Sequence, residues 1–140
     1  MRDPYQHLSK MYLQRVFDYN QKTGGFTWKT KLQGEINPFT GKELSVGYLI
    51  RFNKQYAGKE AFTSNQRGYK VCSLHGEQLL AHRVAYKIVY GTLGADKHVD
   101  HINGNKSDNR IVNLRLVTQE DNLIAFHRGN VGHLEHRTYE

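Results

Sequence analysis

The segment that most constrains this chain is HVDHINGNKSDNRIVNLRLVTQEDN, residues 98–122. It opens with a short, partly apolar stretch and then reaches Asn103-Gly104, a dipeptide typical of tight turns. A polar loop follows, and apolar residues return over 111–117 as a second extended stretch. Residues 118–121 fit the Ser/Thr-x-x-Asp/Glu pattern that opens a helix. The segment therefore predicts a strand, a loop rich in Asn and Gly, a second strand and a helix.

Apolar residues at helical spacing predict two further helices upstream. One spans residues 8–19, with Ser9 near its start as a cap. The other spans residues 82–90, HRVAYKIVY, and Gly91 is well placed as the left-handed residue that ends it.

Alternating and apolar stretches predict the upstream strands. Residues 26–29 alternate like a strand, and residues 69–74 form a second one. A tight turn at 75–78 would lead into a return strand at 79–81. Residues 30–47 are polar, contain Gly and Pro, and are expected to form a long irregular connection. The chain as a whole is predicted to be a small α+β protein.

The charge of the chain favours a polyanionic partner. The 140 residues suffice for one compact domain, and 20 Lys and Arg against 13 Asp and Glu give a net charge of +7. Such a domain attracts phosphate backbones through its field and through counterion release. No apolar run reaches the roughly 18 residues of a membrane span, so no membrane partner is expected. The single Cys72 excludes an internal disulfide and a zinc site with several thiolates, which favours an intracellular setting.

The predicted order of elements would bring oxygen ligands together. If the two strands pair and the helix packs across them, Asp100 and Asn122 can offer a carboxylate and an amide to one hard divalent cation. Mg²⁺ fits such a site because it keeps several waters and takes only one or two protein ligands. Its charge would stabilise a phosphoryl transition state and an alkoxide leaving group.

His101 supplies the base that such chemistry needs, since neutral imidazole accepts a proton from water near pH 7. Asn113, at the far end of the loop, is the candidate to hold the backbone or ring of His101 in position. Adjacent residues of a regular strand point to opposite faces. For Asp100 and His101 to face one phosphate, we therefore expect an irregular backbone at this pair.

Plainer interpretations compete for several residues. An Asp-His pair alone is more often a cap or a surface feature than a catalytic pair. Asn103, Asn105 and Asn109 are expected to serve turn geometry, because Asn tolerates left-handed backbone. His82 is as consistent with a place in the core or at a helix start as with a DNA contact.

The two sequences HRVAYKIVYG and VDHINGNKSDNRIVNLRLVTQEDN resemble the HNH, or His-Me finger (ββα-metal), nuclease superfamily, and most closely its phage-type homing endonuclease branch. The resemblance implies that Asp100 binds the metal and that His101 is the general base. Asn113 matches the central Asn that buttresses the loop and orients the His. Asn122 matches the second metal ligand, in the Asn variant of that position.

The resemblance also implies a division of the chain and a function. Residues 68–128 would form the ββα-metal nuclease core, residues 1–67 an accessory, DNA-binding helix-strand region, and residues 129–140 a polar tail. The expected reaction is hydrolysis of phosphodiester bonds in double-stranded DNA, inside a bacterial host, with one Mg²⁺ or a substituting Mn²⁺. Whether one strand is nicked or both are cut depends on oligomeric state, and a homodimer is left open.

A non-cleaving DNA-binding accessory protein on the same scaffold is the alternative function, and an interaction protein is a third. The retained His101 argues against both, since a binder needs no base. Basic residues near the site are expected to contact DNA phosphates: Arg83, Lys87, Lys106, Arg110 and Arg115.

Overall fold

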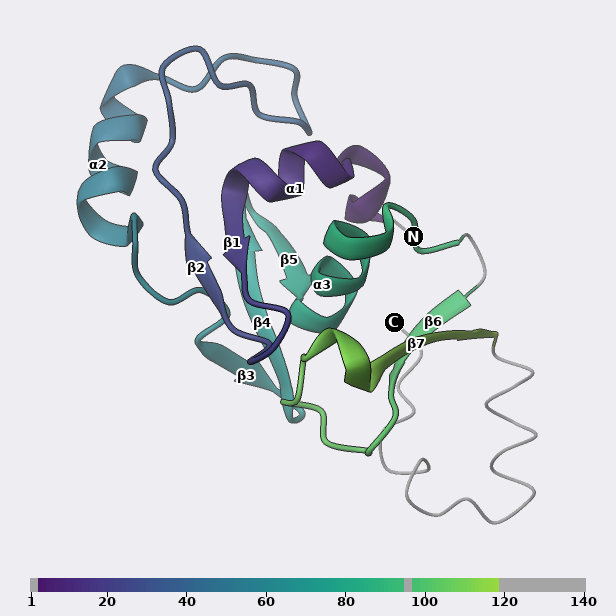
Figure 1. Cartoon of the computed structure of the whole chain (residues 1–140). Coiled ribbons are helices and arrows are strands. Elements are labelled where there is room, and N and C mark those ends of the chain that lie inside the picture. Colours follow the sequence, from purple (N-terminus) through teal and green to yellow (C-terminus); the bar gives the residue numbers. More distant parts are fainter. Residues whose placement is uncertain (1–2, 95–96, 119–140) are drawn as a thin grey trace.

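The computed structural model describes residues 3–94 and 97–118, which form short helices around three small antiparallel sheets (Figure 1). The elements in chain order are η1 (Pro4–His7), α1 (Lys10–Val16), β1 (Phe17–Tyr19), β2 (Phe26–Trp28), α2 (Val46–Tyr56), β3 (Ser64–Gln66), β4 (Tyr69–Leu74), β5 (Glu77–Leu80), α3 (Ala81–Tyr90), β6 (Lys97–His101), η2 (Ile111–Asn113) and β7 (Leu114–Thr118). The prediction of a small α+β protein is confirmed. The helix expected to begin near residue 118, Asn122 and the tail at 129–140 lie outside the described residues.

The helix predicted over 8–19 begins as expected but ends early. The Ser9 hydroxyl accepts a hydrogen bond from the backbone of Tyr12, which satisfies one of the free N–H groups of the first turn. Phe17 is already extended and pairs with Trp28 in the β1–β2 hairpin. Its ring is 2% exposed and lies 4.8 Å from the Trp28 ring, so pairing and burial override helical spacing at this point.

The hairpin of β4 and β5 is tighter than predicted. His75 and Gly76 both have positive φ, at 50° and 83°, which is the backbone of a two-residue hairpin turn. Leu74 therefore pairs with Glu77, and the return strand starts two residues before the predicted 79.

Helix α3 follows this hairpin directly and confirms the predicted helix to within one residue, with Gly91 at φ 85° as its left-handed cap. It packs against α1, against β4 and β5, and against both strands of the β6–β7 hairpin. Val84 and Ala85 are fully buried in the core. Helix α3 therefore joins the three-stranded sheet to the β6–β7 hairpin, as Figure 1 shows.

Helix α2 and strand β3 are among the elements that escaped prediction. Residues 30–45 form the expected irregular connection, but α2 starts directly after them, with Ser45 as its cap. Its buried apolar residues are few, Leu49 and Phe52, because the helix packs on the rest of the protein along a narrow strip. Strand β3 is fully exposed and polar, so no alternation marks it. Among the described residues, no helix is long and apolar enough to cross a membrane.

Candidate active site

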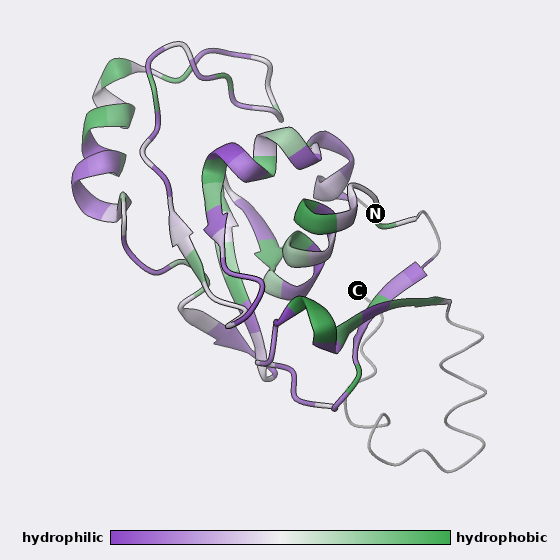
Figure 2. Ribbon diagram, viewed as in Figure 1, coloured by the Kyte–Doolittle hydropathy of each residue, from purple (hydrophilic) through white to green (hydrophobic). Residues whose placement is uncertain are grey.

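Strand β6 carries Asp100 and His101 into the interior, where they are 3% and 1% exposed. The strand pairs with β7 in unbroken register, Asp100 opposite Arg115 and His101 opposite Leu114. The expectation of an irregular backbone at this pair is therefore wrong. The two side chains leave opposite faces of a regular strand, and the irregular loop begins only at Ile102. Figure 2 shows hydrophobic residues along η2 and β7 and hydrophilic ones in much of that loop.

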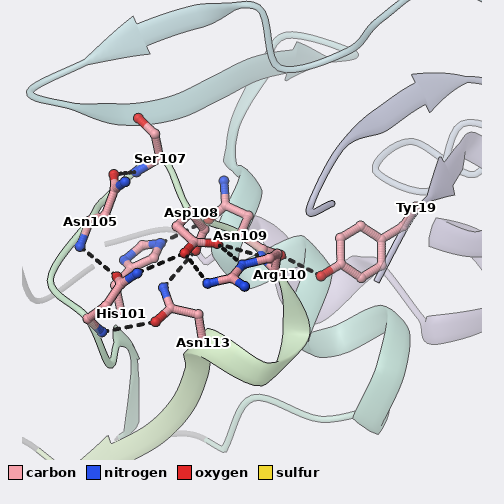
Figure 3. Close-up of polar contacts among 9 residues, drawn as sticks. Tyr19, His101, Asn105, Ser107, Asp108, Asn109, Arg110 and Asn113 are labelled. Carbon is pink, nitrogen blue, oxygen red and sulfur yellow. Dashed lines mark hydrogen bonds and ion pairs between the residues drawn. The ribbon is translucent and has the colours of Figure 1, made fainter. Parts of the chain in front are cut away.

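The imidazole of His101 is held by a neighbour that the sequence analysis assigned to turn geometry. His101 Nε2 lies 2.9 Å from Oδ1 of Asn109, a residue that is itself 2% exposed (Figure 3). An amide oxygen can only accept a hydrogen bond, so this contact places the imidazole proton on Nε2. Nδ1 is then the basic nitrogen of the ring.

Two further aromatic rings lie near the His101 ring. The His82 ring centroid lies 4.9 Å away and that of Tyr69 6.1 Å away. His82 is 3% exposed, which decides between its two interpretations in favour of the core. Burial lowers the pKa of His82 well below its usual range, and the neighbouring His101 and Arg83 lower it further. His82 is therefore a neutral, buried side chain that packs beside His101.

The carboxylate of Asp100 is paired across the hairpin. Its Oδ2 accepts hydrogen bonds from Nε of Arg115 at 3.1 Å and from Nη2 at 2.9 Å. The Arg115 side chain remains 41% exposed, so it reaches from the surface to the buried carboxylate. Asp100 thus presents oxygen to a positive group, and one carboxylate of this kind suits a hard cation that takes few protein ligands.

Asn113 holds the loop closed at its base. Its Oδ1 accepts from the backbone N–H of Asn103 and its Nδ2 donates to the carbonyl of Asp108, both at 2.9 Å. Its own carbonyl accepts from the N–H of Ile102 at 2.8 Å. These contacts correspond to the bracing role expected of Asn113. Among the hydrogen bonds of the described residues, the contact with the His101 ring is made by Asn109 instead.

Within the loop, Asn103 and Asn105 shape turns, but they do so through their side chains and not through the left-handed backbone expected of them, because neither has a positive φ. Their side-chain oxygens accept from the N–H groups two residues ahead, those of Asn105 and Ser107. Asp108 receives two hydrogen bonds from the Arg110 guanidinium, and these chiefly lower the pKa of Asp108 to about 2. The loop is therefore internally hydrogen-bonded over most of its length (Figure 3).

Two of the basic residues predicted to contact DNA lie elsewhere. The Arg83 side chain is buried, at 7% exposure, and its guanidinium lies 4.9 Å from the Tyr5 ring. Lys87 donates to the carbonyl of Tyr5. Both therefore pack on the N-terminal turn η1, and the burial of Arg83 does not match the surface contact expected of it.

The other three predicted contacts lie on the loop and on β7. Lys106 donates to the carbonyl of Arg67 and lies 4.9 Å from the Tyr69 ring. Arg110 and Arg115 are engaged in ion pairs with Asp108 and Asp100, yet 44% and 41% of their side chains are exposed. Two of these three cations thus lie on the loop that follows His101, and the third lies on the strand that pairs with β6.

The described residues include no group of three or more His, Cys, Asp or Glu side chains that could hold a metal ion. A site of the predicted kind needs fewer such groups, because it uses one carboxylate and one amide with water. Asp100 can supply the carboxylate. The predicted amide, on Asn122, lies outside the described residues.

Comparison with known proteins shows that the sequence around this site is similar to one family. Residues 79–124 match the sequence model of the HNH endonuclease family, a stretch that runs from β5 through α3, β6 and the loop to β7 and beyond. Searches of the curated proteins and of the solved structures gave no match. The match supports a nuclease-type function, and HNH nucleases generally use a divalent metal. Residues 79–124 of this chain are thus similar to the HNH endonuclease family.

Proposed function

We propose that this chain is a divalent-metal-dependent DNA endonuclease in which His101 acts as the general base. One observation carries the proposal: within the segment that matches the HNH family, a buried His101 with its Nε2 on an amide oxygen directly follows a buried Asp100 on strand β6. A structural His has no need of a carboxylate at the next position, whereas metal-dependent hydrolysis of a phosphodiester uses both a base and a cation site.

The chemistry of the site follows from these two side chains. With its proton on Nε2, His101 can take a proton from water through Nδ1 and so form the attacking hydroxide. Asp100 and Asn122 would hold Mg²⁺, with Mn²⁺ able to substitute. When bound, the cation supplies positive charge that stabilises the phosphate under attack and the departing 3′-oxygen. The His82 ring, which contacts the His101 ring, is uncharged and therefore adds no positive charge beside the proposed base.

DNA binding in this proposal comes from the net charge and from the cations around the loop. Lys106, Arg110 and Arg115 border the site and would contact phosphates, which positions a duplex without reading its sequence. On the sequence resemblance we further propose a phage-type homing enzyme that acts inside a bacterial host. The division into an accessory region at 1–67, a core at 68–128 and a tail at 129–140 is part of the same proposal.

Incubation of the purified protein with supercoiled plasmid in Mg²⁺, Mn²⁺ or EDTA tests the proposed function. We expect nicked or linear DNA with either metal and none with EDTA. A shift of the plasmid in a gel without cleavage in any metal would contradict the proposal and support the non-cleaving DNA-binding protein. For the variant His101→Ala, which removes the proposed base, His7→Ala is the matched control, because His7 is exposed and lies on η1.

A further inference from the structure

We propose that Asn109 is the residue that positions His101 and fixes its tautomer, and that the turn between β1 and β2 holds Asn109 in place. The catalytic part of this inference rests on the function proposed above. The structural part concerns the protein alone, and it joins residues that are 90 positions apart in the sequence.

The contact between Asn109 and His101 is buried on both sides. The two residues are 2% and 1% exposed, and the Nε2 to Oδ1 distance of 2.9 Å is that of an ordinary hydrogen bond. Loss of the acceptor would leave a buried N–H without this partner, which is unfavourable. The imidazole would then turn, or move its proton to Nδ1, and either change removes the basic nitrogen from its present direction.

The Oδ1 of Asn109 is the atom that contacts the His101 ring. The backbone of Asn109 is fixed from the opposite direction by the β1–β2 hairpin, as Figure 3 shows for Tyr19. The Tyr19 hydroxyl donates to the carbonyl of Asn109 at 2.5 Å, and the N–H of Ile111 donates to the carbonyl of Gln21 at 3.2 Å. Burial raises the pKa of Tyr19, with a smaller effect from Asp108, so the hydroxyl stays protonated and able to donate.

Gly24 permits this close approach. A Cβ at Gly24 would lie 2.6 Å from the backbone N of Arg110 and 2.6 Å from the backbone C of Asn109. Its φ of 79° is also a conformation that favours glycine. The β1–β2 turn therefore packs closely against the backbone of Asn109 and Arg110. Asn109 is the residue whose side chain contacts His101.

The side-chain amides of Asn113 and Asn109 therefore have different roles. Asn113 ties the two ends of the loop together at its base. Asn109, backed by Tyr19, sets the direction of the ring. Asn109 is thus a positioning residue that acts through His101.

The tautomer can be read without any cleavage assay. In ¹⁵N-labelled protein, at a pH where the imidazole is neutral, two-bond ¹⁵N–¹H correlations distinguish a protonated ring nitrogen from an unprotonated one. The His101 signals are identified by their loss in His101→Gln. We expect the proton on Nε2 in the wild type and a mixture of tautomers in Asn109→Leu. A wild-type His101 with its proton on Nδ1, or a Leu variant with the wild-type tautomer, would overturn the inference.

Cleavage of supercoiled plasmid then tests the consequence. Asn109→Leu keeps the size of the side chain and removes the acceptor, so kcat should fall about 10- to 100-fold while KM changes little. Asn109→Asp keeps an acceptor oxygen and should recover most of the lost rate. Tyr19→Phe removes one hydrogen bond and should lower kcat about 2- to 10-fold. A folded Leu variant with wild-type kcat would contradict the inference, and so would an equal loss in the Asp variant.

The two proposals fail in different ways. If the wild type cuts and His101→Ala does not, but Asn109→Leu cuts as the wild type does, the positioning role is wrong and the nuclease function stands. If the wild type does not cut, the nuclease function is wrong, and the spectrum of the wild type still decides the role of Asn109. If Asn109→Leu fails to fold, Tyr19→Phe and the wild-type spectrum carry the test.

Discussion

Arg115 donates two hydrogen bonds to a single oxygen of Asp100, from Nε at 3.1 Å and from Nη2 at 2.9 Å, across the β6–β7 pair. The residue proposed to bind a metal cation is thus paired with the residue proposed to bind a phosphate. A cation on the Asp100 carboxylate and the Arg115 guanidinium compete for the same negative charge, which links metal binding to DNA binding.

This competition gives a first prediction. Arg115→Gln removes the guanidinium, so Mn²⁺ should bind about 2- to 5-fold more tightly in the absence of DNA, a range set by the modest strength of a partly exposed ion pair. Affinity for DNA should fall, and its dependence on salt should weaken by about one phosphate contact. Calorimetric titration with Mn²⁺ measures the first effect, with Arg110→Gln as control, because Arg110 pairs with Asp108 instead. Weaker Mn²⁺ binding by Arg115→Gln would contradict the assignment.

Asn113 supports a prediction on stability. Asn113→Ala leaves the N–H of Asn103 and the carbonyl of Asp108 without this partner, which should lower the free energy of unfolding by about 1–3 kcal/mol. Asn105→Ala is the control, because Asn105 is exposed and serves only one turn, and its cost should stay within about 0.5 kcal/mol. Urea denaturation measures both. Equal stability of the two variants would show that Asn113 does not brace the loop.

The pair of Asp108 and Arg110 should make stability depend on acid pH. Hydrogen bonds from Arg110 lower the pKa of Asp108 to about 2 in the folded protein, below its value in the unfolded chain. The resulting stabilisation is present above about pH 4 and is lost as the pH falls toward 2. Because 44% of the Arg110 side chain is exposed, solvent screens the pair and we expect a small effect. In Asp108→Asn, the free energy of unfolding should therefore fall less between pH 4 and pH 2 than it does in the wild type. An equal fall in the two proteins would show that the pair of Asp108 and Arg110 does not cause the pH dependence.

Gly24 offers a test of the packing between the β1–β2 turn and the backbone of Asn109 and Arg110. Gly24→Ala adds a Cβ that would meet the backbone of Asn109 and Arg110 at 2.6 Å, and it also places Ala at φ 79°. Gly41 has a similar φ of 75° and no atom within 4 Å of its added Cβ, so Gly41→Ala isolates the conformational cost of about 1–2 kcal/mol. Thermal unfolding should show a larger loss for Gly24→Ala than for Gly41→Ala. Equal losses would mean that the hairpin does not press on the loop.

Local patterns predicted the elements whose signals lie within a few residues. Ser9 marked the start of α1, Gly91 marked the end of α3, and the strand before Asn103-Gly104 was placed to within one residue. The end of α1 was wrong because Phe17 leaves the helix to pair with Trp28, a contact that helical spacing does not contain. Strand β3 was missed because its side chains are all polar and exposed.

The site shows the same limit. The positions of Asp100, His101 and Asn113 followed from the pattern of residues and from the resemblance to HNH nucleases. Asn109 was assigned to turn geometry because Asn tolerates left-handed backbone, and nothing local distinguishes it from Asn105. Its role depends on the approach of Tyr19 from another hairpin and on the burial of His101, and both arise only when the chain has folded.

The central claim is that His101 is the base of a metal-dependent nuclease, and the rate of plasmid nicking in Mg²⁺ by wild type and His101→Ala tests it most directly. Removal of a general base should slow the reaction by about 10²- to 10⁴-fold. Binding of Mn²⁺ and of plasmid, measured on the same preparations, should change little, because His101 is proposed to bind neither. A loss of this size with unchanged binding is the result we predict. A His101→Ala variant that nicks DNA at the wild-type rate would contradict the claim.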